Sequence, residues 1–351
     1  MNKRQWTRLP QINLRVGSKS TALQCVLSIT FLTVNLLTGI FVLADEIDRS
    51  AILSTAHSSV ANEQAIVQYV CRFKVVEGHA RSRGQVESGK LEEITSSGNG
   101  VWARNGQEEL FAYIPDQPPQ LSADGTIEST TSETIIKSEL IQAMLTPNSM
   151  TLSPRDSPRL DATLNPWRML GFFSSDTEFN SAGTTLAGYI ELAPKGVVFT
   201  SETVGAVTAV SIVEDDATHT MEFNSGKSDI AQRVTVSLKG KEAYGEACCV
   251  STVEEDGAFF PTLVWYGRSE APGLQSADKF PMKVKRWEVT RIDFREPNTE
   301  ELTIRTEEKM QVNISSNNQH RPINLERGYA VSPSNLKKIA QALYSANSPD
   351  K

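Results

Sequence analysis

The chain has 351 residues, of which 39% are apolar and 22% are charged, with 21 glycines and 16 prolines. This ordinary globular composition excludes a collagen-like repeat, a wholly disordered chain, a multi-span membrane protein and a small disulfide-dense scaffold. The first 44 residues hold five lysines and arginines and no acid, which leaves 30 basic residues against all 42 acidic residues in the rest. A body this acidic argues against a general nucleic-acid-binding surface.

The N-terminus has the pattern of an export signal. A basic head of 20 residues precedes an uncharged run at 21–44, which is most apolar at 29–44 and ends in Val42-Leu43-Ala44 before Asp45. Short residues at the third-last and last positions favour signal-peptidase cleavage between Ala44 and Asp45. The segment would contact the membrane before cleavage, and an uncleaved anchor is the alternative, because about 20 apolar residues can span a bilayer. We therefore expect an exported protein, periplasmic or secreted, or membrane-anchored if the segment is retained.

Three cysteines remain after such cleavage, Cys71, Cys248 and Cys249, and export would place them where disulfides persist. Cys248 and Cys249 are adjacent in a strand-like stretch, so their side chains should point to opposite faces. Only one of them can readily meet Cys71, and we expect a bridge from Cys71 to one of the pair. Buried free thiols are the alternative. The spacing lacks the C-x-x-C pattern of a metal site.

The first part of the body predicts strands with polar connections. Residues 45–64 predict a tether or a short irregular helix, and a β domain follows at 65–331. Apolar and polar residues alternate at 67–75, as in a half-buried strand. Residues 77–97 are polar and predict a mobile loop. Asn105-Gly106 predicts a tight hairpin turn between strands at 101–104 and 108–114.

Two helical insertions are expected within the β domain. The capping-box spacing of Thr130 and Glu133, and an apolar stripe that ends at Met144, predict a helix at 131–145. Asn165 followed by Pro166 is typical of a helix start and predicts a short helix at 165–171.

The second half predicts a run of strands joined by tight turns, and this spacing implies an antiparallel meander. A phase slip in the apolar pattern of 283–294 predicts a bulge. Ser332-Pro333 and one apolar face predict a helix in the C-terminal segment 332–351. The fold class is α+β, mainly antiparallel β, with a curved meander sheet, an incomplete barrel, and a few helices covering one face. The predicted strands lie at 189–192, 197–200, 204–214, 218–223, 233–238, 247–253, 259–266, 283–294, 301–305 and 309–314.

No motif in the chain fixes a reaction. H-E-x-x-H, G-x-S-x-G, P-loop and Rossmann patterns are all absent from the sequence. The four histidines are dispersed, so we expect neither a metal site nor a cofactor.

The segment 259–266 is apolar on both faces of one predicted strand, which a sheet open to water on one side does not need. Something must cover the second face: a helix, a loop or a ligand. The candidate covers are the helix at 131–145, the turn at 165–171 with the two aromatics after it, and the terminal helix. Ordinary core packing is the alternative to a groove. The candidate groove residues are Trp167, Phe172, Phe173, Phe259, Leu263, Trp265 and Tyr266.

This layout resembles the periplasmic lipoprotein carriers of the LolA type and related lipid-binding proteins. The segments that carry the resemblance are 67–75, 101–114, 204–223, 259–266 and 283–314. It implies an incomplete barrel whose concave apolar face shelters acyl chains under helices, and non-enzymatic binding of a lipid or a lipidated partner. This chain is longer, and no functional residue of the carriers is matched by position. An envelope interaction protein with a filled core, and an exported hydrolase with an unrecognised site, are the alternatives. The sequence does not indicate an oligomeric state.

Overall fold

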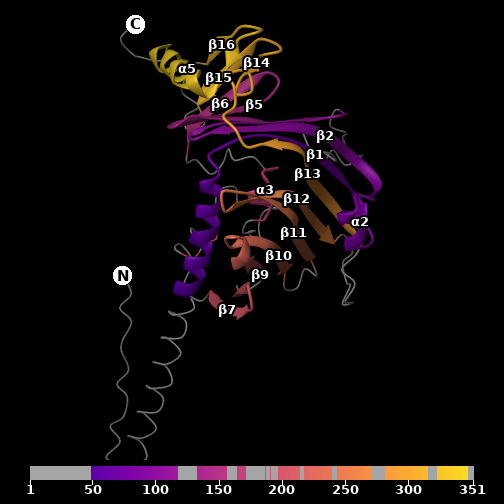
Figure 1. The fold of residues 1–351 in the computed structure, drawn as a ribbon. Helices are drawn as coiled ribbons and strands as arrows, with labels where there is room; N and C mark the ends of the chain where they lie inside the picture. Colours follow the sequence, from indigo (N-terminus) through magenta and orange to yellow (C-terminus); the bar gives the residue numbers. More distant parts are fainter. Residues whose placement is uncertain are drawn as a thin grey trace, which may run out of the picture. The chain divides into compact units, whose positions relative to one another are not determined.

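The protein is described by a computed structural model over residues 49–117, 133–155, 164–170, 186, 190, 197–213, 217–238, 243–269, 281–314 and 322–346. Within these residues, which belong to one compact unit, most of the chain forms a single 15-stranded sheet (Figure 1). The sheet is curved and open, because its two end strands, β7 (Val198–Val204) and β16 (Ile323–Leu325), do not pair with each other. The expected fold class, mainly antiparallel β with a few helices, is confirmed.

Two antiparallel meanders meet in the middle of this sheet. The first runs from β1 to β6 and the second from β7 to β13, and the chain then brings β13 back to pair along β1. The sheet order is β16-β15-β6-β5-β4-β3-β2-β1-β13-β12-β11-β10-β9-β8-β7, and β15 pairs with β6 in parallel. The remaining strands are β1 (Gln68–Ala80), β2 (Glu92–Asn105), β3 (Glu108–Pro115), β4 (Glu133–Lys137), β5 (Ile141–Leu145), β6 (Ser149–Pro154), β8 (Val207–Val213), β9 (Ala217–Asn224), β10 (Ile230–Leu238), β11 (Ala243–Glu255), β12 (Ala258–Ser269), β13 (Met282–Asp293), β15 (Met310–Ile314) and the separate pair β14 (Ile304–Arg305) and β17 (Ala330–Val331).

Short turns set the register of the hairpins. Asp256 and Gly257 both have positive φ between β11 and β12, as a tight hairpin turn requires. The predicted hairpin at Asn105-Gly106 forms, but the two central residues of its turn are Gly106 and Gln107. Asn105 pairs with Glu108, and Gly106 alone takes a positive φ. A glycine at the first central position is what a type II′ turn needs.

The predicted bulge in 283–294 is confirmed on β13. Arg72 pairs with Arg291 while Phe73 pairs with Val289, so Thr290 is the extra residue. Its hydroxyl donates to the carbonyl oxygen of Arg72 at 3.1 Å. The bulge changes which side chains of β13 share a face, and it explains the phase slip in the sequence.

The two faces of the sheet have different covers. We call inner the face that carries Tyr69 and Phe73, and outer the opposite face. The helix at 49–65 and α3 (Pro166–Met169) cover the inner face, because their apolar side chains pack into the same core as those strand residues. The outer face is covered by α2 (Arg83–Glu87) near one end of the long strands and by α5 (Pro333–Ala346) over the first meander.

Two predicted elements are wrong. The helix expected at 131–145 is instead the hairpin of β4 and β5, in the part of that range that the structure describes. Ile135 faces the inner core and Ile136 the outer core, so adjacent β-branched residues fill both faces of one strand. The mobile loop expected at 77–97 is also wrong, because β1 continues to Ala80, α2 follows, and β2 begins at Glu92.

Several boundaries also change. The strand predicted at 204–214 is split, because the chain turns at Gly205 (φ 63°) and Val204 pairs with Val207. Of the strand predicted at 189–192, the structure describes only Ile190, which is helical. The expected tether or irregular helix at 45–64 is a helix over 49–65. The strand predicted at 301–305 shortens to the two residues of β14.

The short helix at 165–171 and the terminal helix both form. α3 begins after Asn165, whose side-chain oxygen accepts from the backbone N–H of Trp167 at 2.9 Å. α5 begins after Ser332, and the Asn335 side chain accepts from the Ser332 backbone N–H at 2.9 Å. The apolar face of α5 is buried in the outer core, as predicted; it consists of Leu336, Ile339, Ala340 and Leu343.

Candidate functional site

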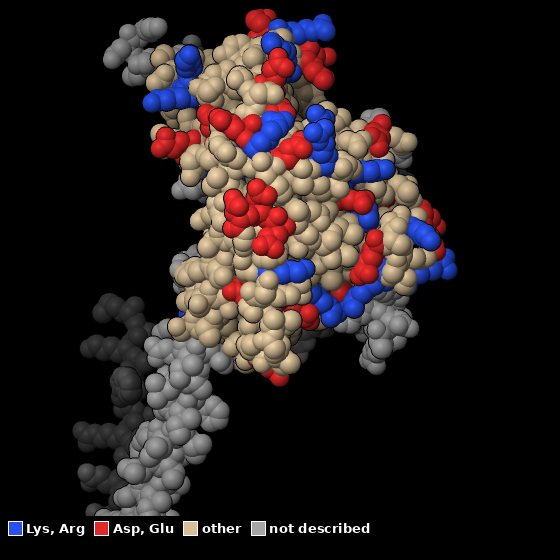
Figure 2. Space-filling view, in the orientation of Figure 1, with Lys and Arg blue, Asp and Glu red and all other residues tan. Residues whose placement is uncertain are grey.

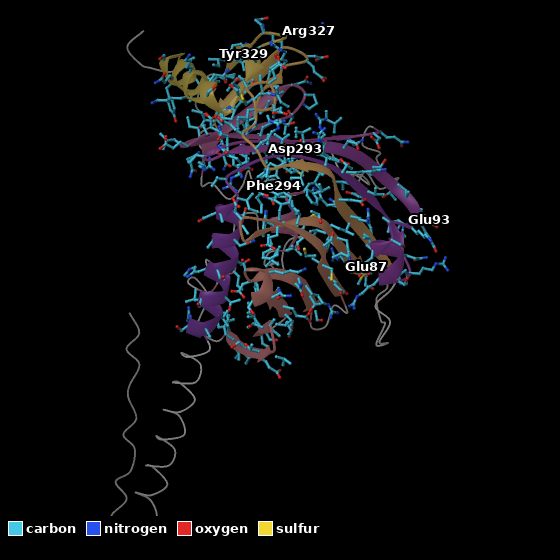
Figure 3. All side chains as sticks on the ribbon, viewed as in Figure 1. Glu87, Glu93, Asp293, Phe294, Arg327 and Tyr329 are labelled. Atoms are coloured by element: carbon cyan, nitrogen blue, oxygen red, sulfur yellow. The ribbon has the colours of Figure 1, made fainter. Side chains whose placement is uncertain are left out.

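A group of aromatic rings lines the inner face around Phe260. The ring of Phe260 on β12 lies 5.1 Å from that of Tyr69 and 5.8 Å from that of Trp102, measured between centroids. We call these rings, together with the other rings that contact Phe260, the Phe260 cluster. The other members are Trp167 at 6.3 Å, Phe294 at 6.3 Å and Trp287 at 6.5 Å. Figure 3 shows side chains filling the inside of the curve of the sheet.

The cluster joins strands that are distant in sequence. Tyr69 comes from β1, Trp102 from β2 and Trp287 from β13, and these three strands are neighbours in the sheet. Two further rings extend the cluster: Phe73 stacks on Phe111 at 5.2 Å and lies 5.3 Å from Trp287. A continuous aromatic surface thus crosses the middle of the inner face.

A glycine on β2 makes room for one of these rings. Gly100 pairs with Phe73 across the β1–β2 ladder. A Cβ on Gly100 would lie 2.1 Å from Cζ of Phe73, so any side chain there would displace the ring. The absence of a side chain on Gly100 therefore leaves the space that the Phe73 ring occupies beside β2.

Short segments cover the aromatic surface. Ile52 and Ala56 of the helix at 49–65 pack into the inner core, together with Leu186 and Ile190. Asn62 joins the end of this helix to β12: its side-chain amide donates to the carbonyl oxygen of Phe259 at 2.9 Å and accepts from its N–H at 2.8 Å.

Arg49, the first described residue of the same helix, also holds it. Its guanidinium donates to the carbonyl oxygen of Ile190 and lies 5.7 Å from the centre of the Phe199 ring. The helix is thus attached to the rest of the inner face at Arg49 and again at Asn62.

The Phe260 cluster contains polar atoms that are not hydrogen-bonded. Tyr69 Oη, Trp102 Nε1 and Trp287 Nε1 are fully buried and have no hydrogen-bond partner within the described part of the chain. Burial raises the pKa of the Tyr69 hydroxyl well above its ordinary value, and the nearby carboxylate of Glu109 raises it further. Tyr69 is therefore a neutral hydroxyl, and each indole N–H is an unused donor.

The outer face carries a different cluster. Trp265 of β12 is buried there with Val86 of α2, and Met282 and Val284 pack beside it. The α2 helix is held by Arg83, whose guanidinium lies 2.6 Å from the buried carboxylate of Glu246. The same carboxylate accepts from Nε of Arg233 at 2.9 Å.

The structure separates the seven predicted groove residues. Trp167 belongs to the Phe260 cluster and Tyr266 packs against the inner core, whereas Trp265 lies on the outer face. Phe259 and Leu263 are half-buried strand residues outside both cores, and Phe172 and Phe173 lie outside the described residues.

The centre of the cluster was not among those predicted residues. The residues missed are Tyr69, Phe73, Trp102, Phe111, Phe260, Trp287 and Phe294. The alternation at 67–75 does mark Tyr69 and Phe73 as facing one side, but β1, β2 and β13 become neighbours only through pairing between distant segments.

The expected disulfide is wrong: the three cysteines that the structure describes are free. Cys71 lies on β1 and the other two on β11, with β13 and β12 in between. Three strand spacings of about 4.8 Å put the two strands about 14 Å apart, twice the Cα separation that a disulfide tolerates, and Cys248 is in register with Val76 and not with Cys71. The opposite orientation of the adjacent pair is confirmed, since Cys248 packs beside Trp265 and Cys249 against the inner core.

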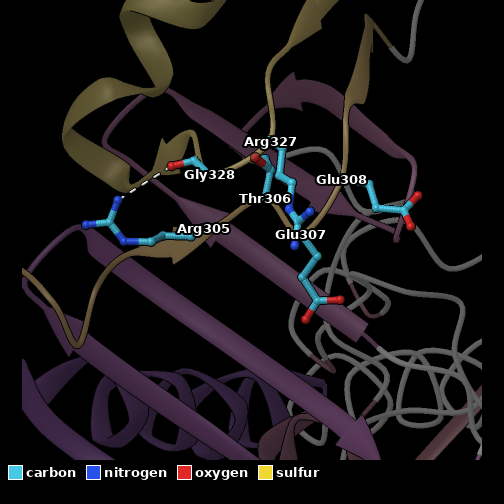
Figure 4. Close-up of a pocket in the computed structure, with 6 residues that line it drawn as sticks. All are labelled: Arg305, Thr306, Glu307, Glu308, Arg327 and Gly328. Carbon is cyan, nitrogen blue, oxygen red and sulfur yellow. Dashed lines mark hydrogen bonds between the residues drawn. The ribbon is translucent and has the colours of Figure 1, made fainter.

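A polar pocket lies beside the β14–β17 pair (Figure 4). It has a volume of about 510 Å³, and Arg305 donates to the carbonyl oxygen of Gly328 at 3.5 Å across it. Its lining mixes two arginines with two glutamates and includes no hydrophobic side chain to pack against an acyl chain; the residues are Arg305, Thr306, Glu307, Glu308, Arg327 and Gly328.

Charges on the face shown in Figure 2 also give no ligand preference. Acidic and basic side chains are largely interspersed on the face shown in Figure 2. Among the described residues, no three His, Cys, Asp or Glu side chains are grouped so that they could hold a metal ion. No helix of that part of the chain is both long and apolar enough to cross a membrane.

Comparisons with known proteins find only a weak similarity to solved structures. No family model and no curated protein matches the chain. Similar solved structures include one described as an outer membrane lipoprotein-sorting protein domain from Vibrio parahaemolyticus, with 10% identity, a TM-score of 0.39, and coverage of 71% of this chain and 94% of that one.

Two other structures are similar to the same extent. A LolA superfamily protein from Nitrosomonas europaea has 8% identity and a TM-score of 0.34, covering 72% of this chain and 95% of that one. A DUF1329 family protein from Desulfovibrio piger has 9% identity and a TM-score of 0.37, covering 70% and 94%. LolA-type proteins are thus among the structures to which this chain is similar, and at such TM-scores no ligand and no residue role is transferred from them.

Proposed function

We propose that this protein is a non-enzymatic carrier that binds a lipid, or the lipid chains of a lipidated partner, at the Phe260 cluster. The observation that carries the proposal is the continuous aromatic surface on the inner face, which is covered by short helical segments and not by a second sheet. An acyl chain that replaced the cover would give the aromatic rings new apolar contacts in place of those that the cover now supplies. Each CH₂ group that it removed from water would contribute about 0.8 kcal/mol.

The cover is attached in a way that allows such an exchange. Between the two ends of the helix at 49–65, Ile52 and Ala56 are its fully buried apolar residues. Asn62 supplies two hydrogen bonds at one end and Arg49 a few contacts at the other. We infer that the cover moves as a unit when a lipid enters.

The N-terminal sequence supports a place for this activity outside the cytoplasm. The basic head and apolar run at 1–44 have the pattern of an export signal, and the described part of the cover helix lies after the expected cleavage at Ala44. We infer that the protein is exported to the periplasm or secreted. N-terminal sequencing of the protein recovered from the cell envelope tests this, with Asp45 as the expected first residue.

The tryptophans provide an internal control for the binding experiment. Trp102, Trp167 and Trp287 belong to the Phe260 cluster, whereas Trp265 is buried on the outer face. The chain is labelled with 5-fluorotryptophan, and each ¹⁹F resonance is assigned with the matching Trp→Phe variant. Palmitoyl-lysophosphatidylcholine is then added as the probe.

The proposal expects the three cluster resonances to shift while that of Trp265 does not. If no resonance shifts, the proposal is refuted, and an interaction protein with a filled core becomes the better explanation. If only the Trp265 resonance shifts, binding is on the wrong face and the assignment of the site is refuted.

A further inference from the structure

The Phe260 cluster has hydrogen-bond donors without acceptors. Trp102 Nε1 and Trp287 Nε1 can only donate, and Tyr69 Oη can donate one hydrogen bond. All three belong to rings that contact Phe260 directly. Within the described residues none of the three donors is hydrogen-bonded.

Such donors are costly in an apolar interior unless something accepts from them. Most buried side-chain polar atoms of folded proteins have a partner, so several unused donors around one ring need an explanation. A pure hydrocarbon offers no acceptor and would leave every donor unused. A carbonyl oxygen inside the cluster would satisfy one or two of them.

We propose that the Phe260 cluster recognises an acyl ester, with the ester carbonyl accepting from Trp102, Trp287 or Tyr69. This inference rests on the proposed function and names the class of its ligand. The apolar chain of the ligand lies against the aromatic surface, and its carbonyl is the group that distinguishes it from other apolar chains. Both a glycerolipid and the diacylglyceryl group of a lipidated protein carry this chemistry.

A matched pair of lipids isolates the carbonyl. Palmitoyl-lysophosphatidylcholine has an acyl ester, whereas hexadecyl-lysophosphatidylcholine has an ether in its place and the same headgroup and chain length. Both are titrated into the purified chain, and the ratio of their dissociation constants is the readout. One neutral hydrogen bond to a buried donor predicts a preference for the ester of about tenfold.

Three variants show which donor is used. W102F, W287F and Y69F each remove one donor and keep an aromatic ring, and Y69F removes only a hydroxyl, so it is the least disturbing to the fold. The inference expects the preference for the ester to fall toward unity in at least one of them. W265F, which changes a tryptophan on the outer face, is expected to leave the ratio unchanged.

The outcomes separate this inference from the proposed function. Equal binding of ester and ether lipids by the wild-type chain overturns the inference and leaves lipid binding intact. A preference for the ester that survives in all three variants also overturns it. Binding of neither lipid removes the proposed function and the inference with it.

A second arm distinguishes the two sources of the ester. The chain is incubated with vesicles of dipalmitoyl phosphatidylglycerol or with a dipalmitoylglyceryl-cysteinyl peptide, and its mass is measured under native conditions. A complex with either one supports ester recognition and identifies the source. A complex with neither overturns it for these natural forms of the ester.

Discussion

Removing the side chain of Asn62 should loosen the cover of the inner face. Asn62 is 4% exposed and makes two hydrogen bonds with the backbone of Phe259, at 2.8 and 2.9 Å, across 197 residues of chain. Each such bond contributes about 0.5–1.5 kcal/mol net, so N62A should lower the free energy of unfolding by about 2 kcal/mol. For a unit of this size, which spans Asp48–Lys351, the unfolding entropy of ~2.1 cal/mol/K per residue makes that a decrease in Tm of about 3 °C.

Urea unfolding measures the total loss, and hydrogen exchange shows where the loss occurs. We expect faster exchange in the helix at 49–65 and at the start of β12, and unchanged exchange in β4–β6. Q64A is the matched control, because Gln64 is exposed on the same helix turn and should change stability by less than about 0.5 kcal/mol. If N62A behaved like Q64A in both measurements, Asn62 would not hold the helix and this account of the cover would be refuted.

Three other predictions concern packing, buried charge and pH. In G100A the new Cβ would lie 2.1 Å from Phe73, so we expect a loss of about 1–3 kcal/mol by urea unfolding. E246Q removes the buried carboxylate that pairs with Arg83 and Arg233 and leaves two partly exposed guanidiniums, so we expect about 2 kcal/mol of destabilisation and faster hydrogen exchange in α2. Burial raises the pKa of Cys71 above its ordinary value of 9.0, so the folded state keeps a proton that the unfolded state releases. The contribution of this thiol to the free energy of unfolding should therefore be complete below pH 9 and fall by about 1.4 kcal/mol per pH unit above it. C71A should reduce that slope in urea titrations between pH 8 and 10.

Each of these predictions has a comparison that would contradict it. A Cβ on Gly84 meets no atom within 4 Å, so G84A should be harmless, and equal effects of G84A and G100A would exclude the steric explanation. E202Q changes an exposed glutamate and should cost less than about 0.5 kcal/mol, and a similar cost for E246Q would show that the buried ion pair is unimportant. An alkaline slope that is identical in C71A and the wild type would assign the loss of stability to other groups, because Cys248 and Cys249 also have pKa values raised to about 12.

The sequence predicts those parts of the fold whose signal is local. Three such patterns depend on residues close together in the chain. The alternation at 67–75 corresponds to β1, the phase slip in 283–294 to the bulge at Thr290, and the Ser332-Pro333 helix start to α5. The helix predicted at 131–145 shows the limit of this method. Its capping spacing and apolar stripe are local features, but pairing with β3 and burial of Ile135 and Ile136 on opposite faces favour strands.

The long loop expected at 77–97 was wrong for a related reason. Glu77 on β1 and Lys285 on β13 form an ion pair with atoms 3.0 Å apart, so polar residues continue the ladder without an apolar alternation to reveal it. The candidate site was found only in part, because the segment 259–266 shows that both faces of β12 are covered without showing by what. The assignment of Phe260 to the inner face and Trp265 to the outer face follows from strand pairing that no local pattern contains.

The difference between the two covers of β12 is the reason to assign binding to the inner face. On the outer face, Trp265 lies under α2, and the buried carboxylate of Glu246 holds that helix through Arg83. Separating this pair would take from the fully buried carboxylate one of its two guanidinium partners, the other being Arg233, so we expect this cover to stay closed. On the inner face, the cover is held by two hydrogen bonds of Asn62, by the contacts of Arg49 and by burial of apolar side chains such as Ile52, without a buried ion pair among the contacts described for it, and it lies over donors that lack acceptors. A ligand that supplied a carbonyl and an apolar chain would replace what the cover provides and offer an acceptor to three donors. The outer face also has a buried donor without an acceptor, the indole N–H of Trp265, but that donor is single and lies with α2, the helix that Glu246 holds in place.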